Sequence, residues 1–206
     1  MARPRVADDE QLLSAAQQVL YELGPADFTL ERAAARGGVS AATLIKRFGS
    51  KQRLFLELNR RWVASIGSGL DAAAAGQATP LARLRAAALW GFDDLDSPGR
   101  TANQLAALAL DLQDPAMQEL LAAGWQIVED RLTELAWAAI AAGELPGARS
   151  AEQVARILHA AGEGIRLTWC VQPSGSLVAR AEADIGAILA AWSGPGTGAG
   201  PGRGQR

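Results

Sequence analysis

The sequence predicts an all-α protein of about nine helices, with three short helices near the N-terminus and a larger helical bundle after them. Hydrophobic residues make up 49% of the 206-residue chain, whereas aromatic residues make up only 5% and β-branched runs are scarce. Alanine and leucine, which favour helices, dominate the apolar positions. These positions recur with the 3.6-residue period of a helix along most of the chain, so helices are expected nearly everywhere.

Local signals bound the three N-terminal helices. Their expected ranges are residues 8–23, 29–36 and 40–47. Gly24-Pro25 stops the first helix, and Thr29 and Ser40 can cap the second and third through their side-chain oxygens. Gly37-Gly38 permits a tight turn between the second and third helices.

The remaining helices follow from apolar stripes and from prolines that interrupt them. A fourth helix is expected after the capping residue Ser50, with an apolar stripe of Leu54, Leu58, Trp62, Ile66 and Leu70. Further helices are expected near residues 80–96, 101–113, 115–142, 150–172 and 176–192. Residues 194–206 have Gly at every second position up to 204, two prolines and no large apolar side chain, which predicts a disordered tail.

The composition also excludes several classes of protein. A net charge of −2 rules out a uniformly basic surface, so any nucleic-acid surface must be local. A single cysteine, Cys170, excludes an intramolecular disulfide, and a single histidine, His159, removes the usual zinc sites. No apolar run reaches the roughly 20 residues that span a bilayer. The N-terminus lacks a secretory signal core. We therefore expect a cytoplasmic protein with no membrane partner, metal or cofactor.

Positive charge is concentrated where the short helices are. Residues 1–62 hold ten Lys and Arg against seven Asp and Glu, and both lysines of the chain lie in this segment. A helix, a Gly-containing turn and a second helix form the helix-turn-helix plan, which places the second helix in the major groove of DNA. Leu44 and Phe48 can anchor that helix inward.

The outward face of the third helix and its surroundings are predicted to contact double-stranded DNA. Small side chains let the backbone approach base edges, hydroxyls reach phosphates, and cations reach guanine or phosphate. The predicted DNA-contacting residues are Thr29, Ser40, Ala41, Ala42, Thr43, Lys46, Arg47 and Lys51. Arg3 and Arg5 are candidates for an N-terminal arm in the minor groove.

A spaced set of residues between Leu12 and Leu54 supports this interpretation. The set is Thr29, Ala34, Gly38-Val39-Ser40, Thr43-Leu44-Ile45, Phe48, Ser50-Lys51 and Leu54. In this pattern the segment resembles the DNA-binding region of TetR-family transcriptional regulators. Two positions differ, because Ile45 stands where the family usually has a phosphate-binding tyrosine and Ala42 replaces a common glycine. The resemblance implies a one-component regulator, expected to be a repressor, that binds a palindromic operator.

The resemblance also implies a dimer and a division of labour along the chain. The helices expected at 150–172 and 176–192 are joined by a short connection, which makes them antiparallel neighbours. In the resembled family such a pair forms a four-helix bundle with its twofold mate. We expect a helix-turn-helix domain at 1–52, an effector-binding and dimerisation domain at 53–193, and the tail at 194–206.

An effector pocket is predicted from the tryptophans that do not fit the apolar stripes. Trp90 and Trp137 lie off the stripes expected for their helices, and such aromatic side chains can line a cavity. The predicted pocket residues are Trp90, Asp93, Asp111, Trp137 and Trp169. The expected effector is a small hydrophobic or aromatic molecule.

Two other classes of function stay open at this point. An all-helical enzyme could use His159, Glu163 and Arg166, which recur on one helix face, although an ordinary structural ion pair explains the same spacing. Alternatively, the apolar helices could bind another protein, with the basic segment serving only as a solvated face. A steep fall of DNA affinity with salt would distinguish the regulator from both alternatives. We favour a DNA-binding regulator that is not an enzyme.

Overall fold

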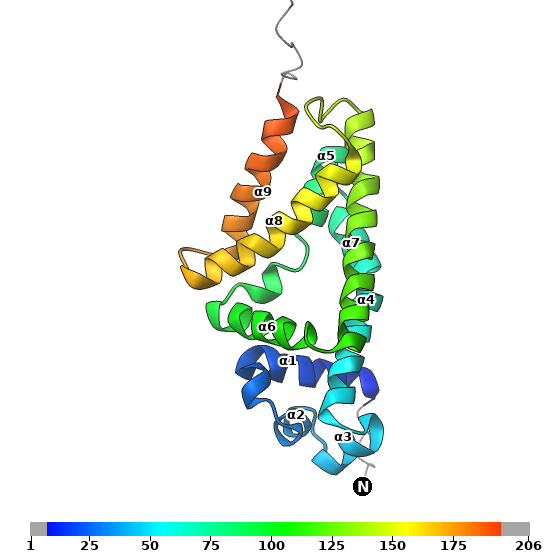
Figure 1. Ribbon diagram of the computed structural model, residues 1–206, viewed down its shortest axis with the longest axis vertical. Coiled ribbons are helices and arrows are strands. Elements are labelled where there is room, and N and C mark those ends of the chain that lie inside the picture. The colour runs from blue at the N-terminus through cyan, green and yellow to red at the C-terminus, as the bar shows by residue number, and fades with distance from the viewer. Residues whose placement is uncertain (1–7, 195–206) are drawn as a thin grey trace, which may run out of the picture. The chain divides into compact units, whose positions relative to one another are not determined.

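The structure is a computed structural model that describes residues 8–194, and all regular elements in that range are helical (Figure 1). The elements are α1 (Asp9–Asp27), α2 (Leu30–Arg36), α3 (Ala41–Phe48), α4 (Lys51–Ala74), α5 (Pro80–Ala88), a 3-10 helix (Asp93–Leu95), α6 (Pro98–Asp111), α7 (Pro115–Ala141), α8 (Ala151–Val171) and α9 (Leu177–Ser193). Nine α-helices and no strand within residues 8–194 confirm the predicted all-α class. Arg3, Arg5 and positions 195–206 of the predicted tail lie outside the described residues. Between residues 8 and 194, no helix combines the length and apolarity needed to cross a bilayer.

Most predicted helix boundaries agree with the structure to within a few residues, but the single helix expected at 80–96 is wrong. Helix α5 ends at Ala88, and the chain resumes regular structure only in the 3-10 helix Asp93–Leu95. Between them Gly91 has φ +81°, a left-handed conformation that breaks the hydrogen-bond pattern of a helix. Trp90 therefore lies after the end of α5. The prediction that Trp90 lies outside the apolar stripe of a helix spanning residues 80–96 is wrong, because that helix does not extend to residue 90.

Contacts group the described chain into two compact units, each built from segments that are separated in sequence. The first unit contains residues 8–66, 95–125 and 170–173. The second unit contains residues 67–94, 126–169 and 174–194. Helix α4 contributes residues to both units.

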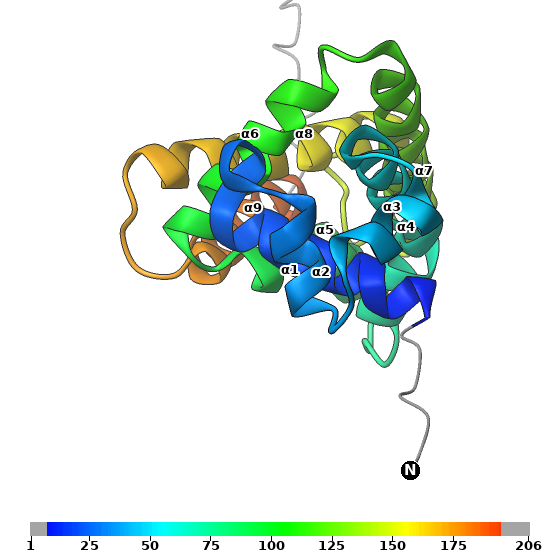
Figure 2. The ribbon, with the colours of Figure 1, turned by 90° about the horizontal axis from the view of Figure 1, so that it is seen from below.

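In the first unit, α1 packs against α6 and α2, and α2 packs against α3 (Figures 1 and 2). Its core is made of apolar side chains from α1 to α4 and from the loop before α2. These are Leu12, Leu13, Ala16, Val19, Leu20, Phe28, Ala33, Ala34, Leu44, Leu54 and Leu58. Leu44 is buried at 1% exposure and Phe48 packs against the same cluster, which confirms the predicted inward face of α3.

A glycine links α1 to α6 within this unit. Gly24 interrupts α1 with φ +76° and ψ 168°, a conformation that is accessible almost only to glycine. A Cβ atom at Gly24 would lie 2.5 Å from Oδ1 of Asn103 on α6. Nδ2 of Asn103 donates a hydrogen bond to the backbone oxygen of Tyr21 at 2.9 Å. The predicted break at Gly24-Pro25 is therefore confirmed, although helical structure resumes after Gly24 and α1 ends at Asp27, and the break also receives a side chain from α6.

In the second unit, α5 packs against α9, and the backbone N–H of Gly147 donates to the oxygen of Trp192 at 2.8 Å. Phe92, Leu132 and Leu158 are among its fully buried side chains. The ring of Trp90 lies against Gly69 of α4, where an added Cβ would come within 2.5 Å of the indole atoms.

Candidate DNA-binding surface

Capping residues and a glycine turn set the angle between α2 and α3. The N–H of Gly37 donates to the oxygen of Ala33 at 3.0 Å, and the N–H of Gly38 donates to the oxygen of Ala35 at 3.2 Å. Gly38 has φ +69°, which turns the chain so that the N–H of Val39 reaches the oxygen of Ala34 at 2.9 Å. Because this turn demands a left-handed residue, glycine is the natural choice there.

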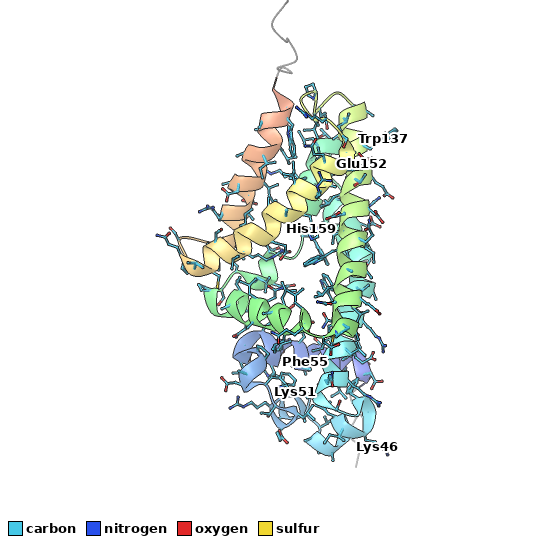
Figure 3. The ribbon with its side chains drawn as sticks, viewed as in Figure 1. Lys46, Lys51, Phe55, Trp137, Glu152 and His159 are labelled. Atoms are coloured by element: carbon cyan, nitrogen blue, oxygen red, sulfur yellow. The ribbon has the colours of Figure 1, made fainter. Side chains whose placement is uncertain are left out.

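Helix α3 presents a mixed small, apolar and cationic face to solvent. Ala42 and Lys46 are exposed, and Ile45 is 49% exposed although it is a large hydrophobic residue. Leu44, on the opposite side of the helix, is buried. Lys46 is labelled at the far end of α3 in Figure 3. Methyl groups of this kind can contact thymine methyls, and a lysine can reach guanine or a phosphate.

Two of the predicted DNA-contacting residues, Thr29 and Ser40, use their hydroxyl oxygens to cap helices. Oγ1 of Thr29 accepts a hydrogen bond from the N–H of Arg32 at 3.2 Å. Oγ of Ser40 accepts from the N–H of Thr43 at 3.2 Å and lies 3.0 Å from Oγ1 of Thr43. A hydroxyl that accepts in this way keeps its own proton, so donation to a DNA phosphate stays chemically open. Ala41 is half-buried and packs against the core of the first unit.

Arg47 is held by α1. Its Nη1 lies 2.9 Å from Oδ1 of Asp9, and its side chain is only 25% exposed. The first turn of α1 thus places a carboxylate beside the last turn of α3. Contact between Arg47 and DNA stays a prediction. To bind a phosphate, the guanidinium group would have to interact with Asp9 and with the phosphate at the same time, or leave Asp9.

Lys51, at the start of α4, points its ammonium group into the protein. Nζ donates to the backbone oxygens of Pro25 at 2.9 Å and Phe28 at 2.8 Å. The same ammonium lies 5.3 Å from the ring centroid of Phe28 and 5.5 Å from that of Phe55. Lys51 therefore joins α4 to the loop between α1 and α2, and its predicted phosphate contact stays untested.

Two further arginines near the turn between α2 and α3 differ in their contacts with the protein. Arg36 donates to Glu22 on α1 through both terminal nitrogens, at 3.0 and 2.5 Å. This hydrogen-bonded pair lowers the pKa of Glu22 and raises the pKa of Arg36. Arg53 is exposed one turn into α4, and its side chain covers Gly49 at the end of α3. Arg53 and Ile45 belong to the exposed surface but were absent from the predicted contact set.

The comparisons with known proteins agree with this geometry. The model for bacterial regulatory proteins of the tetR family matches residues 12–58. The model for the C-terminal part of BetI-type transcriptional repressors matches residues 80–193, more than half of the chain. The chain belongs to the TetR family. It is thus a DNA-binding transcriptional regulator with an N-terminal helix-turn-helix, as the resemblance predicted.

Solved structures of TetR-family regulators are similar along most of the chain. The structure of SmeT, the repressor of the Stenotrophomonas maltophilia multidrug efflux pump SmeDEF, is 26% identical with a TM-score of 0.67. That similarity covers 96% of this chain and 95% of SmeT. A SmeT–triclosan complex is 23% identical with a TM-score of 0.67, covering 96% of this chain and 97% of that one. A TetR regulator from Haloarcula marismortui is 19% identical with a TM-score of 0.74, covering 89% and 96%. No curated protein sequence matches the chain.

The predicted effector-binding residues of this TetR-family protein differ in the unit to which they belong and in their exposure to solvent. Asp111 belongs to the first unit, and the other four predicted pocket residues belong to the second. Trp169 is buried at 4% exposure, whereas Trp137 is 68% exposed and points away from α8 (Figure 3). Asp93 is exposed in the 3-10 helix. The structure thus divides these five residues between two units, and the predicted effector pocket stays a prediction.

The three residues of the enzyme alternative form ordinary polar pairs in the second unit. Nδ1 of His159 lies 3.1 Å from Oε1 of Glu129 on α7. Nη1 of Arg166 donates to Oε1 of Glu163 at 2.5 Å, and its guanidinium carbon lies 4.3 Å from the ring centroid of Phe92. Membership of the TetR family points to a regulator and not to an enzyme.

Proposed function

We propose that this chain is an effector-responsive transcriptional repressor that binds a palindromic operator in the cytoplasm as a homodimer. The observation that carries the proposal is the exposed face of α3, where Ala42, Ile45 and Lys46 project from a helix that Leu44 anchors in the core. Direct reading of bases requires a few side chains projecting from a helix whose own position is fixed. The similarity to SmeT, described as a repressor, supports the direction of regulation.

Two exposed apolar side chains of α8 support the dimer. Leu167 and Val171 lie four residues apart on α8 and are 54% and 80% exposed. Residues at this spacing share a helix face, and exposed apolar side chains of this size favour burial against a partner. A twofold dimer would place two copies of α3 about one turn of DNA apart. A monomeric mass by light scattering at micromolar concentration would contradict the dimer.

A buried polar atom in the second unit supports an effector site there. Nε1 of Trp169 is buried and has no hydrogen-bond partner, and the same is true of Nε of Arg166, three residues earlier on α8. Buried N–H groups are nearly always paired, so a bound molecule with an acceptor atom would complete this site. The aromatic ring of Phe92 under the Arg166 guanidinium adds apolar surface nearby.

The effector would act by shifting populations. A ligand lowers DNA affinity only by the ratio of its affinities for the DNA-binding and non-binding conformers. Helix α4 follows α3 after two residues and contributes to both units, so it is the element we assign to transmit the change. Identical spacing of the two α3 helices in DNA-bound and effector-bound structures would refute this assignment.

Triclosan, which is bound in the SmeT complex, is the first effector probe to test. We expect saturable quenching of tryptophan fluorescence that is lost in Trp169→Phe and kept in Trp137→Phe, since Trp137 is exposed. A saturable signal that survives Trp169→Phe unchanged would reject Trp169 as part of the site.

The experiment that tests the operator is selection of random double-stranded DNA by the purified protein at near-physiological salt, followed by sequencing. We expect a twofold-symmetric motif. With that motif as probe, Lys46→Ala should reduce the slope of log affinity against log salt by about one unit per half-site. Arg60→Ala is the matched control, because Arg60 is exposed but paired with Glu57 on α4. Absence of any enriched sequence, or equal slopes in both variants, would contradict the proposal.

A further inference from the structure

The first unit contains a cavity that the DNA-binding function does not use. Its volume is about 340 Å³, and its walls come from the first two turns of α4, the end of α6 and the beginning of α7. All of its lining residues lie within the first unit. Pockets that hold small molecules typically start at about 300 Å³, so the space suits a ligand of modest size.

Most of the cavity wall is apolar. Phe55 contributes an aromatic ring from α4, where Figure 3 labels it, and its ring packs edge-on against Phe28 with centroids 4.9 Å apart. Met117 of α7 is buried at 4% exposure, and Leu110 of α6 is 50% exposed at the edge. An aromatic ring beside a thioether offers a polarisable surface that favours cations as well as apolar groups.

Two of the charged groups in the wall are already engaged. The ammonium of Lys51 binds the backbone oxygens of Pro25 and Phe28. Asp114 accepts hydrogen bonds from Nε2 of Gln52 and from the N–H of Ala116, both at 2.9 Å. These hydrogen bonds lower the pKa of Asp114 and keep it an anion. The positive charge of Lys51 is therefore offset by the negative charge of Asp114.

Asp111 is the third charged residue of the cavity wall, and no positive charge in the wall offsets it. Its Oδ2 accepts one hydrogen bond, from the neutral amide of Asn59 at 3.3 Å. No described Lys, Arg or His forms an ion pair with it, although the carboxyl group is half-buried at the end of α6. Burial and the neighbouring Asp114 raise the pKa of Asp111, whereas the amide of Asn59 lowers it less. A half-buried carboxylate of this kind is stabilised by a cation close to it.

We propose that this cavity binds a small monovalent organic cation, with the ammonium group beside Asp111 and the apolar part against Phe55 and Met117. The cation would neutralise the one unbalanced carboxylate, and the aromatic ring would add a cation–π contact. An anion is disfavoured because the ammonium of Lys51 is already bound to two carbonyl oxygens. Binding requires no DNA, so the inference stands independently of the proposed function.

Met117 provides a direct signal for the test, because the chain has only two methionines and the other is Met1. The full-length protein would carry ¹³C-methyl methionine, and its methyl resonances would be followed by NMR during titration with phenyltrimethylammonium. The neutral isostere tert-butylbenzene and the anion benzenesulfonate are matched probes of similar size. We expect saturable shifts of the Met117 methyl with the cation, and at least about tenfold weaker binding of the two other probes.

Two variants test the assigned residues. Asp111→Asn should weaken phenyltrimethylammonium binding at least about tenfold, since it removes the charge and keeps the shape. Glu119→Gln removes an equal charge from an exposed position on α7 outside the cavity and should bind as the parent does. Leu110→Trp, at a half-exposed position where a larger side chain can be accommodated, should block the cavity. Equal binding of the neutral probe, equal affinity in Asp111→Asn, or no saturable Met117 shift would overturn the proposal.

Discussion

Lys51 was predicted to bind DNA, and the structure instead leads to a prediction about stability. We consider Lys51→Met, which keeps the aliphatic stem and removes the ammonium. The change leaves the backbone oxygens of Pro25 and Phe28, both residues being buried, without their donor. It also removes the cation near the rings of Phe28 and Phe55.

The magnitude follows from these contacts. A hydrogen bond to a charged group contributes about 1.5–3 kcal/mol. A partly desolvated cation–π contact adds about 0.5–2 kcal/mol. Because one ammonium makes all four contacts, they overlap, and we expect a loss of about 2–4 kcal/mol. For a chain of this size that corresponds to a melting temperature lower by roughly 5–15 °C.

The assay is thermal unfolding followed by circular dichroism, combined with the salt dependence of DNA binding. Lys46→Met is the matched control, because Lys46 is exposed on α3. That control should change stability by no more than about 0.5 kcal/mol and should reduce the salt slope. If Lys51→Met melted with the parent protein while its salt slope fell by about one unit, the ammonium would sit on phosphate and the reasoning would be refuted.

Three further predictions concern other residues of the first unit. Gly24→Ala should cost about 2–3 kcal/mol in a thermal melt, because its backbone conformation is almost exclusive to glycine, whereas Gly99→Ala on α6 should be nearly neutral. Asp9→Asn should strengthen operator binding in a low-salt fluorescence-anisotropy titration, since it releases Arg47 from this ion pair. An unchanged affinity would contradict this prediction. Asp111→Asn should stabilise the protein to urea at neutral pH, because burial raises the pKa of Asp111 and so disfavours its charged form in the folded chain. This advantage should shrink as the pH falls through the raised pKa, and a constant advantage at all pH values would contradict it.

The sequence predicted those parts of the fold that depend on neighbouring residues. Thr29 and Ser40 cap α2 and α3 by bonding to N–H groups three residues ahead, so a short window of sequence contains both partners. The break at Gly24 was predicted in the same way. The helix expected at 80–96 failed because Gly91 adopts a left-handed conformation, and glycine does not reveal from sequence alone whether it will do so.

The roles of the cations could not be predicted, because their partners are distant in sequence. Arg47 pairs with a residue 38 positions away, and Lys51 bonds to carbonyl oxygens 26 and 23 positions away. Charge and spacing alone therefore could not separate a lysine that binds phosphate from one that holds a loop. Asp111 was selected as a polar anchor, but its surroundings became visible only when α4, α6 and α7 were placed together.

The discontinuous make-up of the first unit has a consequence for engineering hybrid regulators. Helices α2 and α3 have seven and eight residues, too short to be stable by themselves in water. Their support includes α6, which packs along α1 and supplies Asn103 to the break at Gly24. If the DNA-binding helices were transferred to another protein by cutting the chain after α3, they would lose the support of α6. A hybrid that recombines operators and inducers should therefore carry residues 95–125 along with the N-terminal helices, as a graft of two separate pieces of chain.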